Sequence, residues 1–224
     1  QNVSDNGVDN ASGYGLKFGI QSEIVKGLSI AASYQSEMDM GEFDKYSGLF
    51  AEKGNFDIPS TWTLGLAWKL VPRSHIVFDV QQINYSDIAA ISNPIAPLLT
   101  CTGSQPGCLG GSQGAGFGWT DITIYKLGYE FGAGANWLWR LGYSHTNQPI
   151  PDSEVVFNIL APAVIEDHAT LGFTVLVSKK SEINFQYMHG FKNSITGKNT
   201  FNPSQDIILE MVQNEIEVSW AKKF

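Results

Sequence analysis

Apolar residues alternate with small or polar residues, with a period of two, along nine segments of this chain. A period of two places successive side chains on opposite faces of a β-strand, so each segment is predicted to be a strand with one apolar face. The segments are residues 13–20, 28–34, 61–70, 75–82, 123–131, 137–145, 169–177, 182–188 and, roughly, 207–224. The sequence therefore predicts an all-β protein.

The connections between these segments are alternately short and long. Short connections are expected near residues 21–27, 71–74, 132–136 and 179–181, and long ones near residues 38–59, 85–120, 147–167 and 191–205. Short turns at one rim and long loops at the other are typical of the barrels of the bacterial outer membrane. We therefore expect an antiparallel transmembrane β-barrel.

The composition favours a membrane barrel over a soluble one. Charged residues make up 16% of the chain, well below the usual share of about a quarter. A soluble sandwich or lipocalin-like barrel also alternates, but here the second face consists mainly of Gly, Ser, Thr, Ala and Asn, which suit a crowded lumen. No apolar run reaches the length of about 18 residues that a transmembrane helix needs. The net charge of −8 argues against a nucleic-acid partner.

The number of predicted strands is odd, whereas single-chain bacterial barrels have an even number. If the last strand ends at the rim of the short turns, the first strand begins at the rim of the long loops. Residues 1–12 would then be the end of an external loop, and residues 13–224 the C-terminal nine strands of a larger barrel. The first strands and any N-terminal plug are expected to be absent from this chain, so that the N-terminal part of the same protein is a partner.

The last segment carries four apolar residues of one parity, Ile216, Val218, Trp220 and Phe224. Outer-membrane barrels of many families end in a strand with a terminal aromatic residue, and this segment resembles such an ending. We interpret the four residues as a C-terminal insertion signal for the barrel-assembly machinery. The apolar face of the wall is expected to contact outer-membrane lipid and lipopolysaccharide.

The two cysteines, Cys101 and Cys108, flank a segment that contains Gly103, Pro106 and Gly107 and can turn back on itself. They form either a small disulfide-closed loop or two free thiols. Their proximity favours the disulfide, which implies an oxidising compartment. A zinc site would need further Cys or His residues nearby, so no metal is expected.

Several stretches of the chain carry a family resemblance: "GYGLKFGI", "LSIAASYQSEMDMGEFDKYSGLF", "FDIPSTWTLGLAWK", "HIVFDVQQINYSDI" and "NPIAP". They resemble the outer-membrane long-chain fatty acid and hydrocarbon transporters, the FadL/TodX family. The resemblance implies a fourteen-stranded barrel with an N-terminal plug, of which this chain would hold the last nine strands. It also implies passive uptake of hydrophobic compounds, either long-chain fatty acids or aromatic and aliphatic hydrocarbons, without a cofactor.

Two other functions remain open, a general aqueous porin and a structural or receptor protein of the outer membrane. A porin should have a lumen rich in charge, whereas the predicted lumen face is small and neutral. An enzyme is not expected, because no predicted strand places Ser, His and Asp together on one face.

Members of the family capture substrate in an apolar groove between external loops. By strand count, residues 38–59 match one of the two loops that form this groove. The apolar residues of this loop are Phe43, Tyr46, Leu49, Phe50 and Phe56. An exposed apolar patch implies a binding surface, so we interpret the five residues as substrate-binding. The alternative is that they pack the loop against its neighbours.

Lys126, Glu130 and Arg140 are predicted to form a charge cluster on the lumen face of adjacent strands. Counting through the turn at 132–136 places Arg140 opposite Gly128 and diagonal to the other two. Such a cluster could hold a substrate carboxylate through charge-assisted hydrogen bonds. A structural ion-pair ladder that fills the lumen or meets the plug is the favoured alternative.

Three histidines, His145, His168 and His189, are expected at the outer ends of three consecutive strands. His168 has the parity of the lumen face, whereas the other two have that of the lipid face. We therefore expect them to be polar residues of the membrane interface rather than a metal or acid–base site.

Overall fold

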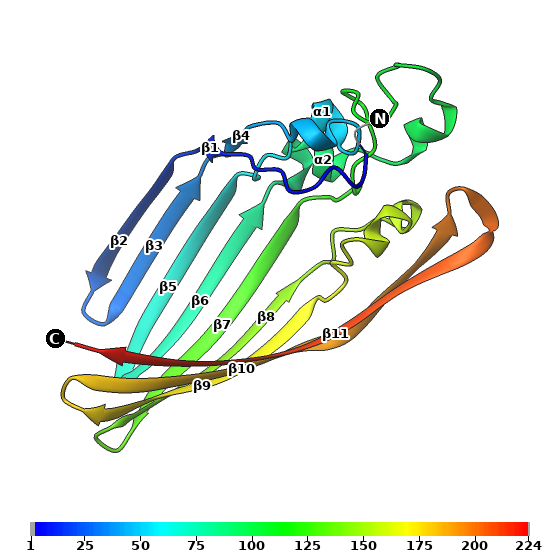
Figure 1. The fold of residues 1–224 in the computed structure, drawn as a ribbon. Helices are drawn as coiled ribbons and strands as arrows, with labels where there is room; N and C mark the ends of the chain where they lie inside the picture. Colours follow the sequence, from blue (N-terminus) through cyan, green and yellow to red (C-terminus); the bar gives the residue numbers. More distant parts are fainter. Residues whose placement is uncertain (1–2, 224) are drawn as a thin grey trace.

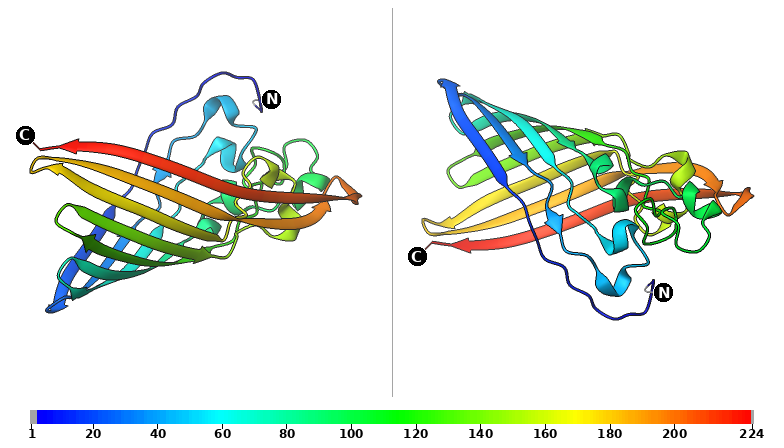
Figure 2. Two further views of the ribbon diagram at one scale, coloured as in Figure 1. Left: turned by 90° about the horizontal axis from the view of Figure 1, so that it is seen from below. Right: turned by 90° about the horizontal axis from the view of Figure 1, so that it is seen from above.

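A computed structural model of the chain describes residues 3–223 and shows a curved antiparallel sheet (Figures 1 and 2). Nine strands lie in the order β11-β10-β9-β8-β7-β6-β5-β3-β2, so each main strand neighbours the next along the chain. The strands are β2 (Lys17–Val25), β3 (Leu28–Gln35), β5 (Thr61–Val71), β6 (Ser74–Ile83), β7 (Ile122–Ala133), β8 (Trp137–Thr146), β9 (Asp167–Ser178), β10 (Ser181–Asn199) and β11 (Asn202–Lys222). The predicted all-β antiparallel architecture is confirmed.

Smaller elements occupy the long connections at one rim (Figure 1). They are the paired strands β1 (Gly13–Tyr14) and β4 (Asp39–Met40), the short helices α1 (Ala51–Gly54) and α2 (Ala89–Ser92), and the 3₁₀ turns η1 (Asp44–Tyr46), η2 (Tyr85–Asp87), η3 (Ala96–Thr100), η4 (Asp152–Glu154) and η5 (Phe157–Ile159). Within residues 3–223, no helix has the length and apolar character needed to cross a bilayer.

The register of the sheet gathers the apolar side chains on one face. Leu66 of β5 lies opposite Ile30 of β3 and opposite Phe78 of β6. The rings of Phe173 and Phe185 stack across β9 and β10, with centroids 5.2 Å apart. We call this the outer face. Because side chains alternate along a strand, the intervening residues form the opposite, inner face.

The outer face includes three of the four residues of the predicted insertion signal. Ile216, Val218 and Trp220 are 68%, 67% and 66% exposed. Exposed apolar side chains in a contiguous band are expected where a wall meets lipid rather than water. Phe224 lies outside the described residues, and a role of this segment in assembly stays a prediction.

The hairpin of β10 and β11 is much longer than expected. The two strands pair as far as Asn199 and Asn202, so the loop predicted over residues 191–205 is wrong. Only Thr200 and Phe201 remain between the strands. The hairpin therefore extends past the ends of its neighbours at the rim of the long loops (Figure 1).

A β-bulge explains why this extension was hidden in the sequence. The register shifts between Gly190 and Asn193 of β10, which adds one residue and moves the later side chains to the opposite parity. A constant period of two therefore does not predict the part of the strand beyond Gly190. Two ion pairs, each with an N–O distance of 2.7 Å, cross the extension: Lys192 with Glu210, and Lys198 with Asp206.

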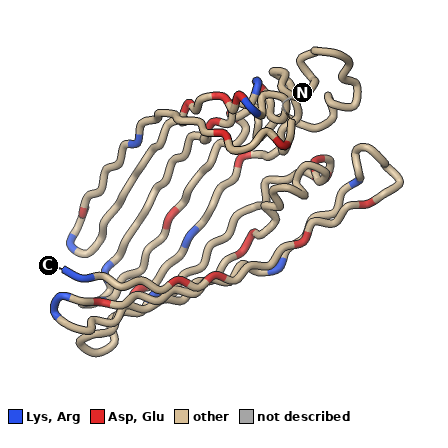
Figure 3. Tube along the Cα trace, viewed as in Figure 1, with Lys and Arg blue, Asp and Glu red and all other residues tan. Residues whose placement is uncertain are grey.

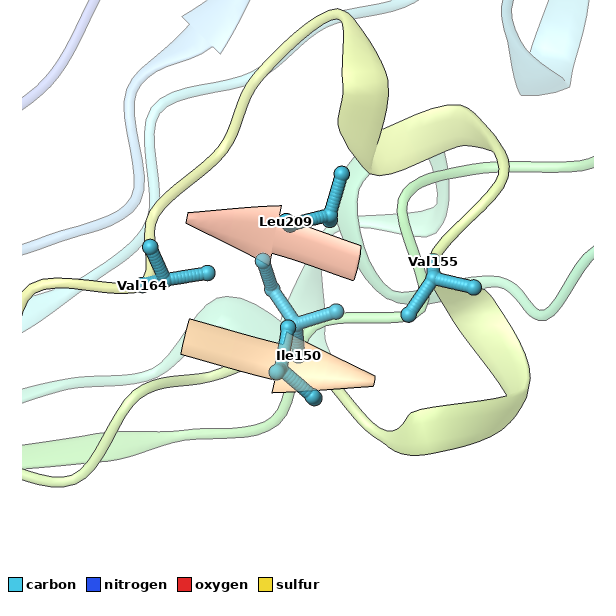
Figure 4. Close-up of a cluster of buried hydrophobic side chains, with 5 residues drawn as sticks. Ile150, Val155, Val164 and Leu209 are labelled. Carbon is cyan, nitrogen blue, oxygen red and sulfur yellow. The ribbon is translucent and has the colours of Figure 1, made fainter. Parts of the chain in front are cut away.

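The connection between β8 and β9 folds against the hairpin extension. Its residues Ile150, Val155 and Val164 pack with Ile195 of β10 and Leu209 of β11, and none of the five is more than 8% exposed (Figure 4). Burying an aliphatic side chain of this size contributes about 1.5–3 kcal/mol. The sheet extension and the loop thus share a compact hydrophobic core at the outer rim.

Two further connections agree with the sequence. Cys101 and Cys108 form a disulfide within the connection between β6 and β7, as predicted. The segment of residues 3–12 lies along the connection between β3 and β5, where the Tyr46 hydroxyl donates to the carbonyl of Gly7 at 2.6 Å. The assignment of this segment to an external loop stays a prediction.

The packing of the connection between β8 and β9 against the hairpin can be tested by a substitution at Gly197. A Cβ at this position would collide with the backbone carbonyl of Asp152. We expect Gly197→Ala to displace the loop at a cost of about 1–3 kcal/mol, seen as faster proteolysis within residues 147–166. Gly19→Ala is the matched control, because its Cβ would lie 3.7 Å from the Cβ of Ser33. Equal proteolysis in both variants would contradict the proposed packing.

Candidate functional site

A belt of hydrogen-bonded side chains crosses the inner face near the rim of the short turns. Arg140 of β8 donates from Nε to Glu130 Oε2 at 2.9 Å and from a terminal nitrogen to Thr174 Oγ1 at 2.8 Å. The Thr174 hydroxyl donates to Asn184 Oδ1 at 2.6 Å. The belt therefore links β7, β8, β9 and β10 through side chains as well as through the backbone ladder.

His75 of β6 continues the belt on its other side. Its Nδ1 lies 3.6 Å from Glu130 Oε1 and is buried without a hydrogen bond, so the contact becomes an ion pair only if His75 is protonated. A hollow of about 360 Å³ lies beside these groups and is lined by His75, Glu130, Arg140, Thr174 and Asn184, among others. Most residues that line the hollow are polar or charged, and several of them already hydrogen-bond to one another.

The structure corrects the predicted charge cluster. Arg140 lies directly opposite Glu130, not opposite Gly128, because the hairpin closes on the pair Ala133 and Trp137. Lys126 lies opposite Ser144, far from the ion pair along β7, and its ammonium donates to Gln81 Oε1 at 2.7 Å. The physical reason is the turn, which has only three residues and uses the positive φ of Gly134. The ion pair of Arg140 and Glu130 is compatible with a structural ladder, and a role of the cluster in substrate binding stays a prediction.

Charged residues lie along the strands as well as in the loops (Figure 3), and the register gives many of them inner parity. The charged residues of inner parity are Lys17, Glu23, Lys69, Asp79, Lys126, Glu130, Arg140, Glu182, Glu215 and Glu217. The prediction of a small and neutral lumen therefore holds for β3 and β9, which carry no Lys, Arg, Asp or Glu of inner parity, but not for β2, β7 and β11, which carry two each. The overall composition of the inner face hides this difference between strands.

The wall formed by β2, β3, β5 and β6 is hollowed on both sides. An apolar hollow of about 370 Å³ on the outer face is lined by Ile20, Leu64, Leu66 and Phe78, among others. A second hollow of about 300 Å³ lies on the inner face, where Asp79 forms part of its wall. The two share Ile20, Ala31, Ala32 and Gly65 in their linings. The two hollows therefore lie on opposite faces of the same strands.

The five apolar residues predicted to bind substrate in the connection between β3 and β5 are all half-buried. Phe50 and Phe56 contact each other edge to face, with ring centroids 5.1 Å apart. The backbone amides of Glu52 and Lys53 donate to Gly111 and Gly110 at 3.0 and 2.9 Å. Packing against neighbouring loops accounts for part of this burial. Substrate binding by Phe43, Tyr46, Leu49, Phe50 and Phe56 stays a prediction.

A buried polar network, which the sequence did not reveal, joins the connection between β6 and β7 to that between β8 and β9. Glu154, 5% exposed, accepts a hydrogen bond from the amide of Ile95 at 2.8 Å. Asn158, fully buried, accepts from Trp119 Nε1 at 2.6 Å and donates to the carbonyl of Phe117 at 2.7 Å. Buried polar groups that are fully paired fix a unique arrangement, so the two loops form one rigid cap.

The three histidines do not converge. His145 Nδ1 lies 2.8 Å from Asp167 Oδ1, and His189 Nδ1 lies 2.8 Å from Asn214 Oδ1. His168 has the opposite parity and lies across from Ser144. Within the described part of the chain, no group of three or more His, Cys, Asp or Glu side chains could hold a metal ion.

An acidic rim lies where β3 leaves the sheet. Partial burial, together with the carboxylates of Asp57 and Asp87, raises the pKa of Glu37 above its ordinary value. Asp57 is fixed there because its Oδ1 accepts a hydrogen bond from the amide of Met40 at 2.7 Å. The rim is therefore a place where negative charges repel one another at neutral pH.

The rigid cap can be tested through Glu154. Glu154→Ala leaves the amide of Ile95 without its partner, which should cost about 1–3 kcal/mol. We expect faster amide hydrogen exchange in both capping loops, while the strands keep their protection. Glu52→Ala, which removes an exposed carboxylate from another loop, is the control. Exchange that is unchanged in Glu154→Ala would contradict the network.

The acidic rim gives a pH dependence of defined sign. Because folding raises the pKa of Glu37, the folded state favours the protonated form of this side chain. The contribution of Glu37 to the stability of the fold is therefore complete below the unfolded pKa and is lost as pH rises through the folded pKa. We expect Glu37→Gln to protect the rim against proteolysis at pH 7 and to match the wild type at pH 4. A variant that is less stable than the wild type at pH 7 would contradict this assignment.

Comparison with known proteins places this geometry in a family. The profile of the outer membrane protein transport proteins, described as OMPP1/FadL/TodX, matches residues 2–219. No curated protein matches the chain significantly in sequence.

Solved structures share the fold at low sequence identity. The toluene transporter TodX of Pseudomonas putida is 18% identical, with a TM-score of 0.67 over 96% of this chain and 50% of that one. The monoaromatic hydrocarbon channel CymD gives 16% identity and a TM-score of 0.58 over 95% and 51%. A FadL homologue of Pseudomonas aeruginosa gives 12% and 0.59 over 92% and 50%. The chain spans about half the length of these proteins. It therefore belongs to the OMPP1/FadL/TodX family of outer-membrane transport proteins.

Proposed function

We propose that this protein admits hydrophobic small molecules through the bacterial outer membrane by passive diffusion, without catalysis. The observation that carries the proposal is the family match over residues 2–219. The geometry is compatible with it, since the sheet presents an apolar outer face to lipid and a cap of ordered loops at one rim. We propose that the rim of the long loops faces the outside of the cell.

The substrates that fit best are uncharged hydrophobic compounds. Arg140 is the residue that could have bound the carboxylate of a fatty acid, but it already donates to Glu130 and Thr174. A carboxylate at this point would have to replace these partners. Aromatic and aliphatic hydrocarbons need no such exchange, so we favour them over long-chain fatty acids.

The complete barrel requires further strands. Each edge of the sheet, at β2 and at β11, presents backbone groups that no described strand pairs. An unpaired edge in lipid costs several kcal/mol per backbone group. We propose that the N-terminal part of the same protein pairs with both edges and supplies the plug. Lipopolysaccharide around the outer rim and the barrel-assembly machinery are the other proposed partners.

The charges of the inner face favour one alternative, an aqueous porin. Glu215 and Glu217 have inner parity on β11, and carboxylates of this kind line water-filled lumens. Planar-bilayer recording separates the two functions. A large and steady ion conductance would identify a porin, whereas hydrophobe uptake without such conductance supports the transporter.

The apolar loop provides a specific test of capture. Phe43→Asp and Phe50→Asp should lower uptake of toluene or a long-chain fatty acid about tenfold or more, because charge opposes apolar binding. Phe201→Asp, at the exposed tip of the β10 and β11 hairpin, is the matched control. Folding is checked by heat-dependent mobility in detergent gels. If all three variants take up the probes like the wild type, the loop is not the capture site.

A further inference from the structure

We propose that the inner hollow beside Asp79 is a polar subsite that receives a hydroxyl or amino group on an otherwise hydrophobic molecule. The inference rests on the proposed function and deepens it, because it names the substituent that the pathway selects. The subsite would favour alcohols, phenols and amines, accept hydrocarbons without a gain in affinity, and disfavour carboxylates.

The hollow has a volume of about 300 Å³ and lies on β2, β3, β5 and β6. Its polar lining comes from Gln21, Ser33, Thr63 and Asp79, which all have inner parity. The absence of a side chain at Gly65 makes room for the carboxylate, since a Cβ there would lie 2.5 Å from Asp79 Oδ1. The carboxylate therefore extends over β5, toward the hollow.

Asp79 is left without the partner that its register offers. Lys126 lies directly opposite on β7, but its ammonium donates to Gln81 at 2.7 Å. The ion pairs found within residues 3–223 do not include Asp79. This contrasts with Glu130, which is held by Arg140 at 2.9 Å. Of these two inner carboxylates on neighbouring strands, one is committed to a protein partner and the other faces an open hollow.

The chemistry of the group defines the ligand. An ionised carboxylate only accepts hydrogen bonds, so the complementary group is an N–H or O–H donor. Charge-assisted bonds of this kind are about twice as strong as neutral ones. The Asp79 carboxylate has inner parity, and the interior of outer-membrane barrels is polar. The small residues around it admit a ligand without displacing bulky side chains.

The test compares ring compounds that differ in one substituent. Toluene, benzyl alcohol, benzylamine and benzoate are offered to the purified full-length protein, and binding is measured by ligand-observed NMR. Asp79→Leu should weaken benzyl alcohol and benzylamine about tenfold and change toluene by less than about twofold, as expected for one charge-assisted bond. Asp79→Asn should improve benzoate relative to the wild type, because it removes the repulsion between carboxylates.

Glu217→Gln is the matched control, since it removes another inner carboxylate on the distant strand β11. The proposal is overturned if Asp79→Leu weakens all four probes alike, if it weakens none, or if Glu217→Gln reproduces its pattern. Uptake by whole cells is measured in parallel. Selective binding at Asp79 with no uptake of any probe would support the subsite and refute the proposed function, so the two failures are distinguishable.

Discussion

The backbone ladder from β2 to β11 is the constraint on which the rest of this structure depends. In lipid, every N–H and C=O must be bonded within the wall, so a strand can neither end early nor slip by one residue. A slip would move every side chain to the other face. The alignment of Leu66 with Ile30 and Phe78 is a direct result, and so is the inner position of Glu130 and Arg140.

The same ladder decides which inner charges can meet. Glu130 and Arg140 lie opposite each other and form an ion pair, and Thr174 extends the contact to the next strand. Asp79 and Lys126 are also opposite, but neighbouring side chains divert them, with Gln81 taking the ammonium and Gly65 admitting the carboxylate. Whether two opposite charges form an ion pair, as Glu130 and Arg140 do, or stay apart, as Asp79 and Lys126 do, therefore depends on the residues beside them.

The loops at the rim of the long connections are held by other contacts, because they have no backbone ladder between strands. Two kinds of contact hold these loops in place of a backbone ladder. One is apolar burial around Ile150 and Leu209, and the other is the hydrogen bonding of the buried groups of Glu154 and Asn158. A cap fixed in this way does not act as a hinged lid, because opening it would expose both a core and a polar network. We therefore propose that a ligand enters beside the connection between β3 and β5, whose aromatic side chains are half-buried.

The sequence by itself predicted the nine strands and the outer face and favoured the disulfide of Cys101 and Cys108, because a period of two and a close cysteine pair are local patterns. It also carried the resemblance to the family, which the profile match confirms. It missed the hairpin beyond Gly190, because one bulged residue reverses the parity. It also misaligned Arg140, because the turn has three residues rather than the five expected, which shifts the pairing of the hairpin by two residues. Only the tertiary structure decided that Lys126 leaves Asp79 free and that Glu154 locks two loops. Such contacts join residues far apart in the chain, and no local pattern encodes them.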